Sequence, residues 1–319
     1  MKCPNCQRDN YPGAKFCLGC GAPLPQPPSR GKMALIALLK AAAYYGLFFV
    51  VQTSVMFFYE IALLMPEAFR LGLSGGAIDG DLMERLTKTL MDSLSQNIHI
   101  LLILSGALTL LILFFFYHLR KKNPLDEMHL TGTPLPPLVM ALALGIAVQF
   151  FVSITLTFLP IPESMIESFN ENRSTELIYG GGPLWLELIS ITVVTPILEE
   201  VIFRGLIFTR LRRAMSAFLA LGVCAVIFGA VHGHIIAFIY AGLLGILLCL
   251  LMLRVNDSVL APIFCHMGFN FGSYLVNWTF GDTVNMPLML AFYFVSIALT
   301  LLCAYMIFRR TDQEAEEEV

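Results

Sequence analysis

Charged residues are scarce in this chain. Asp, Glu, Lys and Arg make up only 13% of its 319 residues, and hydrophobic residues make up 57%. Soluble globular domains carry roughly a quarter charged residues. This shortage, with a mean hydropathy of +0.75, excludes an ordinary soluble protein and indicates a polytopic membrane protein. The bilayer is its first expected partner, and no nucleic-acid partner is expected.

Several familiar signatures are also missing. The H-E-x-x-H zinc motif does not occur, and neither Ser190 nor Cys265 belongs to a nucleophile motif. No internal repeat of the kind found in secondary transporters is visible. Because a polar, cysteine-rich segment precedes the first apolar run, we expect no cleaved signal peptide.

Long apolar runs dominate the rest of the chain. A spanning helix needs about 20 mostly apolar residues. The candidate spans are residues 33–59, 98–117, 135–159, 184–208, 215–231, 235–253, 258–280 and 287–308. The predicted fold is therefore an all-α membrane protein with about eight transmembrane helices around a polar cavity. Residues 81–95, with leucines four apart, predict a separate amphipathic helix on the outer face.

Lys and Arg are divided unevenly between the loops that join these spans. One side carries the basic residues Arg30, Lys32, Arg120, Lys121, Lys122, Arg210, Arg212, Arg213, Arg254, Arg309 and Arg310, and the other carries Arg70, Arg85, Lys88 and Arg173. The side richer in Lys and Arg faces the cytosol. The pattern predicts a multi-pass plasma-membrane protein with both termini in the cytoplasm.

The composition changes along the chain in a way that suggests its organisation. We expect a zinc ribbon over residues 1–24, a Pro-rich linker over 25–32, three transmembrane helices with outer loops over 33–182, a catalytic core over 183–308 and an acidic tail over 309–319. Function is sought in the core because polar residues there move inside the apolar runs.

The first segment holds four cysteines in the pattern C-x2-C-x10-C-x2-C. They are Cys3, Cys6, Cys17 and Cys20. Each C-x2-C turn can direct two thiolates at one tetrahedral ion, which predicts a structural zinc. Disulfides and a redox pair are the alternatives; a reducing cytosol disfavours the first and the lack of a βαβ unit the second. The arrangement resembles bacterial zinc ribbons, although Gln7 stands where these often have glycine. A cytosolic partner for the ribbon is left open.

Charged side chains also occur inside the fourth apolar run. Glu199, Glu200 and Arg204 lie within residues 184–208. Each charge costs about 2.5–3.5 kcal/mol at the centre of an inserted helix, which makes an intramembrane carboxylate a candidate functional group. Glu200 and Arg204 are four apart and can form an ion pair. Glu199 lies about 100° around the helix, so it needs another partner or another role.

Imidazole and amide groups follow on the next runs. His232, His266 and Asn270 lie at the ends or in the interior of apolar segments; each could alone be a satisfied core residue or bind helices together. A carboxylate and an imidazole can hold and deprotonate a water, while a second imidazole and an amide can donate to an oxyanion. Together they suggest peptide hydrolysis. His234, two residues from His232, is expected to face away.

These residues fall into three motifs in a fixed order. The motifs are Glu199-Glu200-x3-Arg204-Gly205, Phe228-x3-His232 and His266-x3-Asn270. They resemble those of the CPBP family of intramembrane proteases, which includes the type II CAAX prenyl endopeptidases and lysostaphin-resistance-like and bacteriocin-processing proteins. The resemblance covers residues 195–270 and the sequence around them. It implies an eight-helix fold and proteolysis of a membrane-associated or lipidated peptide or protein.

The resemblance also implies roles for the individual residues. Glu199 would be the base and His232 would orient the water. His266 and Asn270 would form the oxyanion hole, and Glu200 with Arg204 would brace the site. The family's name suggests a metalloprotease, but a metal at the membrane site stays open, and the ribbon suggests a prokaryotic protein.

Two other functions remain open from the sequence. One is a non-catalytic binding or immunity protein on the same scaffold, and the other is a proton or ion transporter. The depth of His232 provides a structural test. A full, upright fifth helix would put His232 near the outer surface, so catalysis requires that helix to be short, tilted or only partly spanning.

Overall fold

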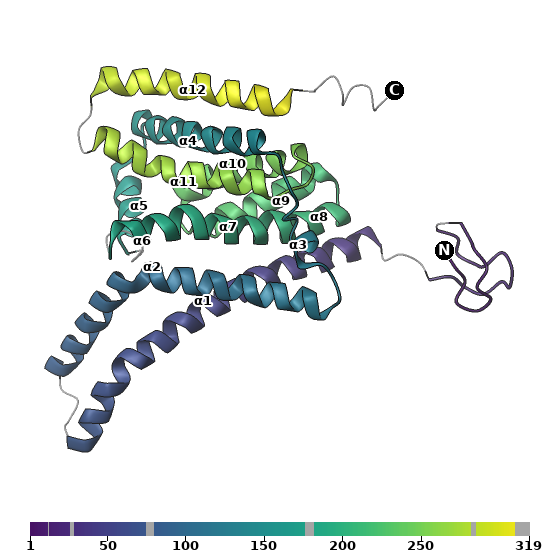
Figure 1. Cartoon of the computed structure of the whole chain (residues 1–319), viewed down its shortest axis with the longest axis horizontal. Helices are drawn as coiled ribbons and strands as arrows, with labels where there is room; N and C mark the ends of the chain where they lie inside the picture. The colour runs from purple at the N-terminus through teal and green to yellow at the C-terminus, as the bar shows by residue number, and fades with distance from the viewer. Residues whose placement is uncertain (12, 26–28, 75–79, 176–181, 282–284, 310–319) are drawn as a thin grey trace.

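The computed structural model describes the chain except residues 12, 26–28, 75–79, 176–181, 282–284 and 310–319. The centre of the expected linker and nearly all of the expected acidic tail thus lie outside the described residues. Within the described part, regular structure is helical, apart from two isolated β-bridges in the cysteine-rich module. Figure 1 shows this small module at one end of the molecule, next to the start of the first helix.

The first two helices form a long hairpin. They are α1 (Arg30–Ser74) and α2 (Gly80–Leu119). The prediction of a separate helix over residues 81–95 is wrong, because the helix continues into the second apolar run. Polar side chains at the junction bond to their own helix: Ser95 donates to the Asp92 carbonyl and Asn97 to the Ser93 carbonyl. These bonds satisfy polar side chains within the helix, so a polar stretch need not end it.

A tight pair of helices forms the opposite side of the core. They are α4 (Leu135–Phe158) and α11 (Leu260–Phe280), and α12 (Met286–Phe308) covers them (Figure 1). Glycines allow the close approach: a Cβ at Gly145 would overlap the Cys265 carbonyl oxygen, and one at Gly268 would overlap that of Leu142. The backbone of α11 is therefore fixed directly against α4.

The fourth apolar run is one continuous helix made of segments. They are α6 (Leu184–Ile189), the π-helical η1 (Ser190–Val194), α7 (Thr195–Glu200), η2 (Val201–Phe208), also π-helical, and α8 (Thr209–Ala214). Pro196 has no N–H to donate to the helix. The N–H of the preceding residue, Thr195, bonds to the carbonyl of Ser190, five residues back. Such π-turns re-aim side chains and are common at functional sites.

Four further helices complete the described part of the chain. They are α3 (Pro124–Glu127), α5 (Glu163–Thr175), α9 (Ala217–Ala230) and α10 (Ile235–Arg254). The predicted fifth span proves short, as expected: α9 has 14 residues, about 21 Å at 1.5 Å per residue.

The predicted count of eight spans is not confirmed. Within the described residues, five helices are long and apolar enough to cross a membrane: α1, α2, α4, α10 and α12. The other three runs depart from a plain span for identifiable reasons. The fourth run is segmented, α9 is short, and α11 carries His266, Asn270 and Asn277.

Candidate active site

A buried ion pair lies next to the candidate site, behind the side chains that line it. Arg204 Nη1 donates to Glu200 Oε1 at 2.6 Å, and both side chains are fully buried. Arg204 Nη2 also approaches the Gly245 carbonyl at 3.4 Å. The guanidinium carbon lies 4.2 Å from the centre of the Phe228 ring, a cation–π contact. The predicted pair between Glu200 and Arg204 is thereby confirmed.

Phe228 joins this ion pair to both histidines. Its ring packs edge-to-face against His232 at 4.9 Å and against His266 at 5.8 Å, measured between ring centroids. The residue is fully buried. One aromatic side chain from α9 therefore contacts Arg204 and both histidines.

His266 lies between the two adjacent glutamates. Its Nδ1 is 2.8 Å from Glu200 Oε1, and its Nε2 is 3.7 Å from Glu199 Oε2. Because a carboxylate only accepts, Nδ1 carries the proton on the Glu200 side. Glu200 is fully buried, whereas the Glu199 side chain is 19% exposed. The two carboxylates thus occupy different environments, as their angle around the helix predicts.

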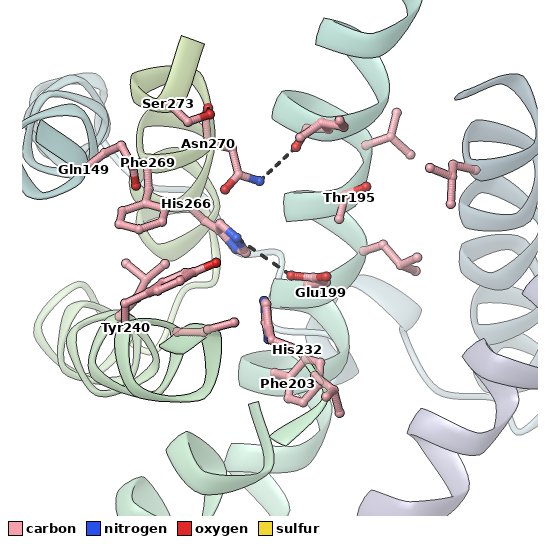
Figure 2. A pocket seen from close by; sticks show the side chains of 18 of the residues that line it. Gln149, Thr195, Glu199, Phe203, His232, Tyr240, His266, Phe269, Asn270 and Ser273 are labelled. Atoms are coloured by element: carbon pink, nitrogen blue, oxygen red, sulfur yellow. Dashed lines mark hydrogen bonds and ion pairs between the residues drawn. The ribbon is translucent and has the colours of Figure 1, made fainter. Parts of the chain in front are cut away.

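Glu199 and His266 face a central cavity of about 410 Å³, together with His232 and Asn270 (Figure 2). The walls come from α1, α2, α4, α5, the 184–214 helix, the α9–α10 turn, α10 and α11. Four of the six predicted site residues therefore meet at one cavity. Glu200 and Arg204 lie behind its wall.

His232 reaches the cavity because α9 ends just before it. The turn that follows includes Gly233 in the left-handed region, with φ of 75°, where glycine has no steric penalty. His232 Nδ1 is 2.7 Å from the Phe228 carbonyl, which can only accept. Nε2 of the neutral ring is then left as an acceptor. His234 instead caps α10, accepting from the Ile236 N–H, in agreement with its expected place outside the site.

Asn270 is oriented by the first π-turn. Its Nδ2 donates to the Ile191 carbonyl at 2.9 Å. Figure 2 shows this bond and shows the side-chain oxygen directed away from Ile191. One amide hydrogen of Asn270 is therefore used by the protein, and the second remains available.

Two family profiles match the chain. Residues 181–272 match a profile described as type II CAAX prenyl endopeptidase, Rce1-like, and residues 2–24 match a zinc-ribbon domain. The chain carries an Rce1-like CAAX protease domain. Members of this family are intramembrane proteases. Comparisons with curated proteins and with solved structures found no match.

The Rce1-like segment contains all six predicted site residues. It leaves out α1, α2 and α4, yet these helices supply part of the cavity wall, including Tyr45, Phe48 and Gln149. Sequence analysis missed these lining residues. Gln149 is a polar residue within an apolar run, which could have served as a signal; the two aromatics have no such signal.

Ser190 has a neighbouring imidazole that no sequence motif indicates. Its Oγ lies 2.8 Å from Nδ1 of His99, so this serine does have an adjacent imidazole. Both side chains are buried, at 0% and 1% exposure, and neither lines the cavity of the Rce1-like domain. The pair joins α2 to the 184–214 helix and presents no accessible nucleophile.

The cysteines of the ribbon fit a tetrahedral metal ion. Their four sulfur atoms lie within 4.8 Å of one another, with Cys3 to Cys20 at 3.6 Å and Cys6 to Cys17 at 3.5 Å. Zn–S bonds of about 2.3 Å place sulfurs about 3.8 Å apart. Backbone N–H groups of Cys20 and Gly19 lower the pKa of Cys17 to about 6, which favours the thiolate that zinc needs.

Gln7 lies at a position of the ribbon where the backbone conformation favours glycine. Gln7 and Gly21 follow the second cysteine of each turn, and both have positive φ, 60° and 70°. A side chain in this region costs about 1–2 kcal/mol, and glycine avoids that cost. Gln7 therefore adopts the glycine conformation without the glycine advantage.

No comparable cluster occurs at the membrane site among the residues that the structure describes. Among the described residues, the ribbon cysteines are the only group in which three or more His, Cys, Asp or Glu ligand atoms lie within 4.8 Å of one another. Glu199 and His266 face each other, but Glu200 is already bonded to Arg204. The donor set at the cavity therefore does not form a ready metal cage.

Proposed function

We propose that this protein is an intramembrane endopeptidase that hydrolyses a peptide bond of a membrane-associated protein or peptide in the central cavity. One observation carries the proposal: Glu199 and His266 face each other across 3.7 Å at a cavity that His232 and Asn270 also line. The Rce1-like domain supports the same reaction class. In this proposal the catalytic core spans residues 183–308, with both termini in the cytoplasm.

Glu199 is the general base in this mechanism. It is the more accessible of the two glutamates, and its carboxylate is not used by the buried ion pair. His232 orients the attacking water through Nε2, because its Nδ1–H is held by the Phe228 carbonyl. Glu199 takes a proton from this water as the oxygen attacks the substrate carbonyl carbon.

His266 and Asn270 stabilise the resulting oxyanion. Glu200 accepts from Nδ1–H of His266, and in this step His266 carries a second proton on Nε2, so that Nε2–H can donate to the oxyanion. Asn270 contributes its second amide hydrogen, since the first is bonded to Ile191. Collapse of the intermediate breaks the C–N bond, and the proton held by Glu199 passes to the leaving nitrogen.

The substrate belongs to a broad class in this proposal. A prenylated protein and an unlipidated membrane-anchored precursor both present a peptide bond close to the bilayer. The cavity favours a substrate that enters as an extended segment, because a folded domain exceeds a volume of about 410 Å³.

The test compares N-terminal peptide profiles of membranes that carry wild-type protein or Glu199→Gln. The expected result is a set of new N-termini that depends on Glu199. Glu187→Gln is the matched control: Glu187 lies on the same long helix but accepts from Tyr274 and does not line the cavity. Its profile should match wild type.

Two results would contradict the proposal. Identical profiles for wild type and Glu199→Gln would argue against proteolysis and favour a binding or immunity function. Proton flux in proteoliposomes that requires Glu199, without any peptide cleavage, would instead indicate a transporter.

A further inference from the structure

A glutamine outside the Rce1-like segment lines the central cavity. Gln149 lies on α4, and the cavity also includes Asn270 and Ser273 of α11. Figure 2 shows Gln149 beside α11, the helix that carries Asn270. Its place depends on Gly272, where a Cβ would lie only 2.8 Å from the Gln149 Cβ. The tight α4–α11 contact thus leaves room for this side chain.

The amide of Gln149 is only half satisfied. Its Nε2 donates to Ser153 Oγ at 2.9 Å, one turn further along α4. Its Oε1 is buried and has no hydrogen-bond partner. Buried amide oxygens nearly always have a donor, so a native exception calls for a ligand or water as its partner.

The orientation of the amide decides what this partner must be. With its nitrogen bonded to Ser153, Gln149 keeps an unused acceptor, a buried oxygen on a residue that lines the cavity. Asn270 adds a second acceptor to the lining, because its side-chain oxygen is directed away from Ile191 (Figure 2). Acceptors bind N–H or O–H donors, and a hydrocarbon chain offers neither. An extended peptide offers backbone N–H groups on either side of its scissile bond.

We propose that Gln149 is a substrate-positioning residue whose Oε1 accepts a hydrogen bond from a backbone N–H of the peptide substrate near the scissile bond. The inference rests on the proposed protease function and adds the direction of the substrate to it. The polypeptide lies along the α4–α11 wall, and a lipid attached to the substrate lies away from Gln149.

The experiment uses a peptide copied from the strongest Glu199-dependent cleavage in the membrane profiles. Purified full-length wild type is assayed with this peptide and with analogues carrying one backbone N-methyl group each. One analogue should raise KM about tenfold, which is 1.4 kcal/mol for the lost hydrogen bond. In Gln149→Met, KM for the unmodified peptide should rise by a similar factor with kcat changed less than about twofold.

The decisive measurement combines the two changes. The sensitive N-methyl analogue should cause no further loss in Gln149→Met, because both changes remove the same bond. Ser153→Ala is the comparison variant: it frees the amide by removing the partner of Nε2 but keeps Oε1, so KM should rise less than in Gln149→Met and the N-methyl sensitivity should remain. Should Gln149→Met fail to accumulate, Gln149→Glu keeps an acceptor of the same length and should retain the N-methyl sensitivity.

Each contrary outcome has a separate meaning. If wild type and Glu199→Gln give the same profiles, the protease function itself fails. If cleavage depends on Glu199 but every N-methyl analogue behaves alike in wild type and Gln149→Met, the role of Gln149 is overturned. Equal losses in Gln149→Met and Ser153→Ala, accompanied by a lower unfolding midpoint, would show that Gln149 only holds a structural water.

Discussion

Two neighbouring glutamates have different surroundings in this protein. Glu200 is buried, paired with Arg204 and bonded to His266, whereas Glu199 is partly exposed at the cavity. The difference arises because successive residues of a helix point about 100° apart. The sequence could predict it from spacing alone. It could not predict that His266 would bridge the two, because α11 is placed by contacts far along the chain.

Glu200→Gln should destabilise the protein strongly. The change leaves the Arg204 charge buried without its counter-charge, and breaking a buried pair in this way costs about 3–5 kcal/mol. Thermal unfolding of the purified protein in detergent measures the effect as a lower midpoint. Glu199→Gln is the matched comparison. Its midpoint should shift by less than the equivalent of about 1 kcal/mol while cleavage is lost; similar midpoints for both variants would contradict the assignment.

At the level of helices, glycines decide how closely α4 and α11 pack. Gly268→Ala would press a methyl group into the Leu142 carbonyl, and overpacking of this kind costs about 1–3 kcal/mol. Because His266 and Asn270 belong to α11, we also expect reduced Glu199-dependent cleavage. Unfolding midpoints and membrane profiles measure the two effects.

Gly222→Ala provides the control for this substitution. Gly222 lies in α9, and a Cβ added there would meet no atom within 4 Å, while alanine favours a helix by about 0.5–1 kcal/mol over glycine. Its stability should stay equal or rise slightly. Equal losses for Gly222→Ala and Gly268→Ala would show that close α4–α11 packing is not the cause.

A second contact between elements should make stability depend on pH. Arg212 of α8 binds Asp257 in the α10–α11 connection through two bonds of 2.7 and 2.6 Å, which lowers the pKa of Asp257. The stabilisation is then complete above the ordinary aspartate pKa of about 3.9 and is lost as pH falls through the lower folded value.

The size of this effect is limited by exposure. The side chains are 26% and 40% exposed, so the contribution should stay below about 1 kcal/mol. Asp257→Asn should lower the unfolding midpoint at pH 7, and the gap to wild type should close toward pH 3. A gap that does not narrow as the pH falls below the ordinary aspartate pKa would indicate that the charge is not responsible.

The bounds of helices could be predicted where an apolar run was continuous. They could not be predicted where a helix continued through a polar stretch. The bounds of α4 and α12 follow their apolar runs within a few residues. The junction at residues 95–97 looked like a break because it is polar, yet its side chains bond to their own helix. The π-turns of the 184–214 helix have no simple period and were not predicted.

For the whole molecule, the sequence motifs located the polar residues of the site but not the other residues that line its cavity. All six predicted residues lie within residues 181–272, where their spacing carries information. Tyr45, Phe48 and Gln149 come from helices whose sequences read as ordinary apolar spans. Their role depends on which surfaces meet in three dimensions, and one sequence holds no record of that.

The ribbon should fold with its metal, separately from the membrane domain. Its core of Cys3, Cys17 and Leu24 is too small to fold without help, so zinc would supply the stability. We expect about one zinc per chain by elemental analysis. Cys17→Ser should lose the metal and make the first 24 residues sensitive to protease, with the unfolding midpoint of the membrane domain unchanged.

The matched control for the ribbon is Cys303→Ser, which changes a cysteine of α12 far from the cluster in sequence. It should retain zinc. Full zinc content in Cys17→Ser would contradict the four-cysteine site. A large fall in the membrane-domain midpoint would contradict the independence of the two parts.

The length of the first hairpin has a consequence for how the molecule sits in a cell. At 1.5 Å per residue, α1 with 45 residues is about 68 Å long and α2 with 40 residues about 60 Å. A hydrocarbon layer is only about 30 Å thick, so roughly half of each helix must extend into water or headgroups. If both termini lie in the cytoplasm, as proposed, this overhang is on the outer side of the bilayer, where antibodies or impermeant reagents would reach it in intact cells.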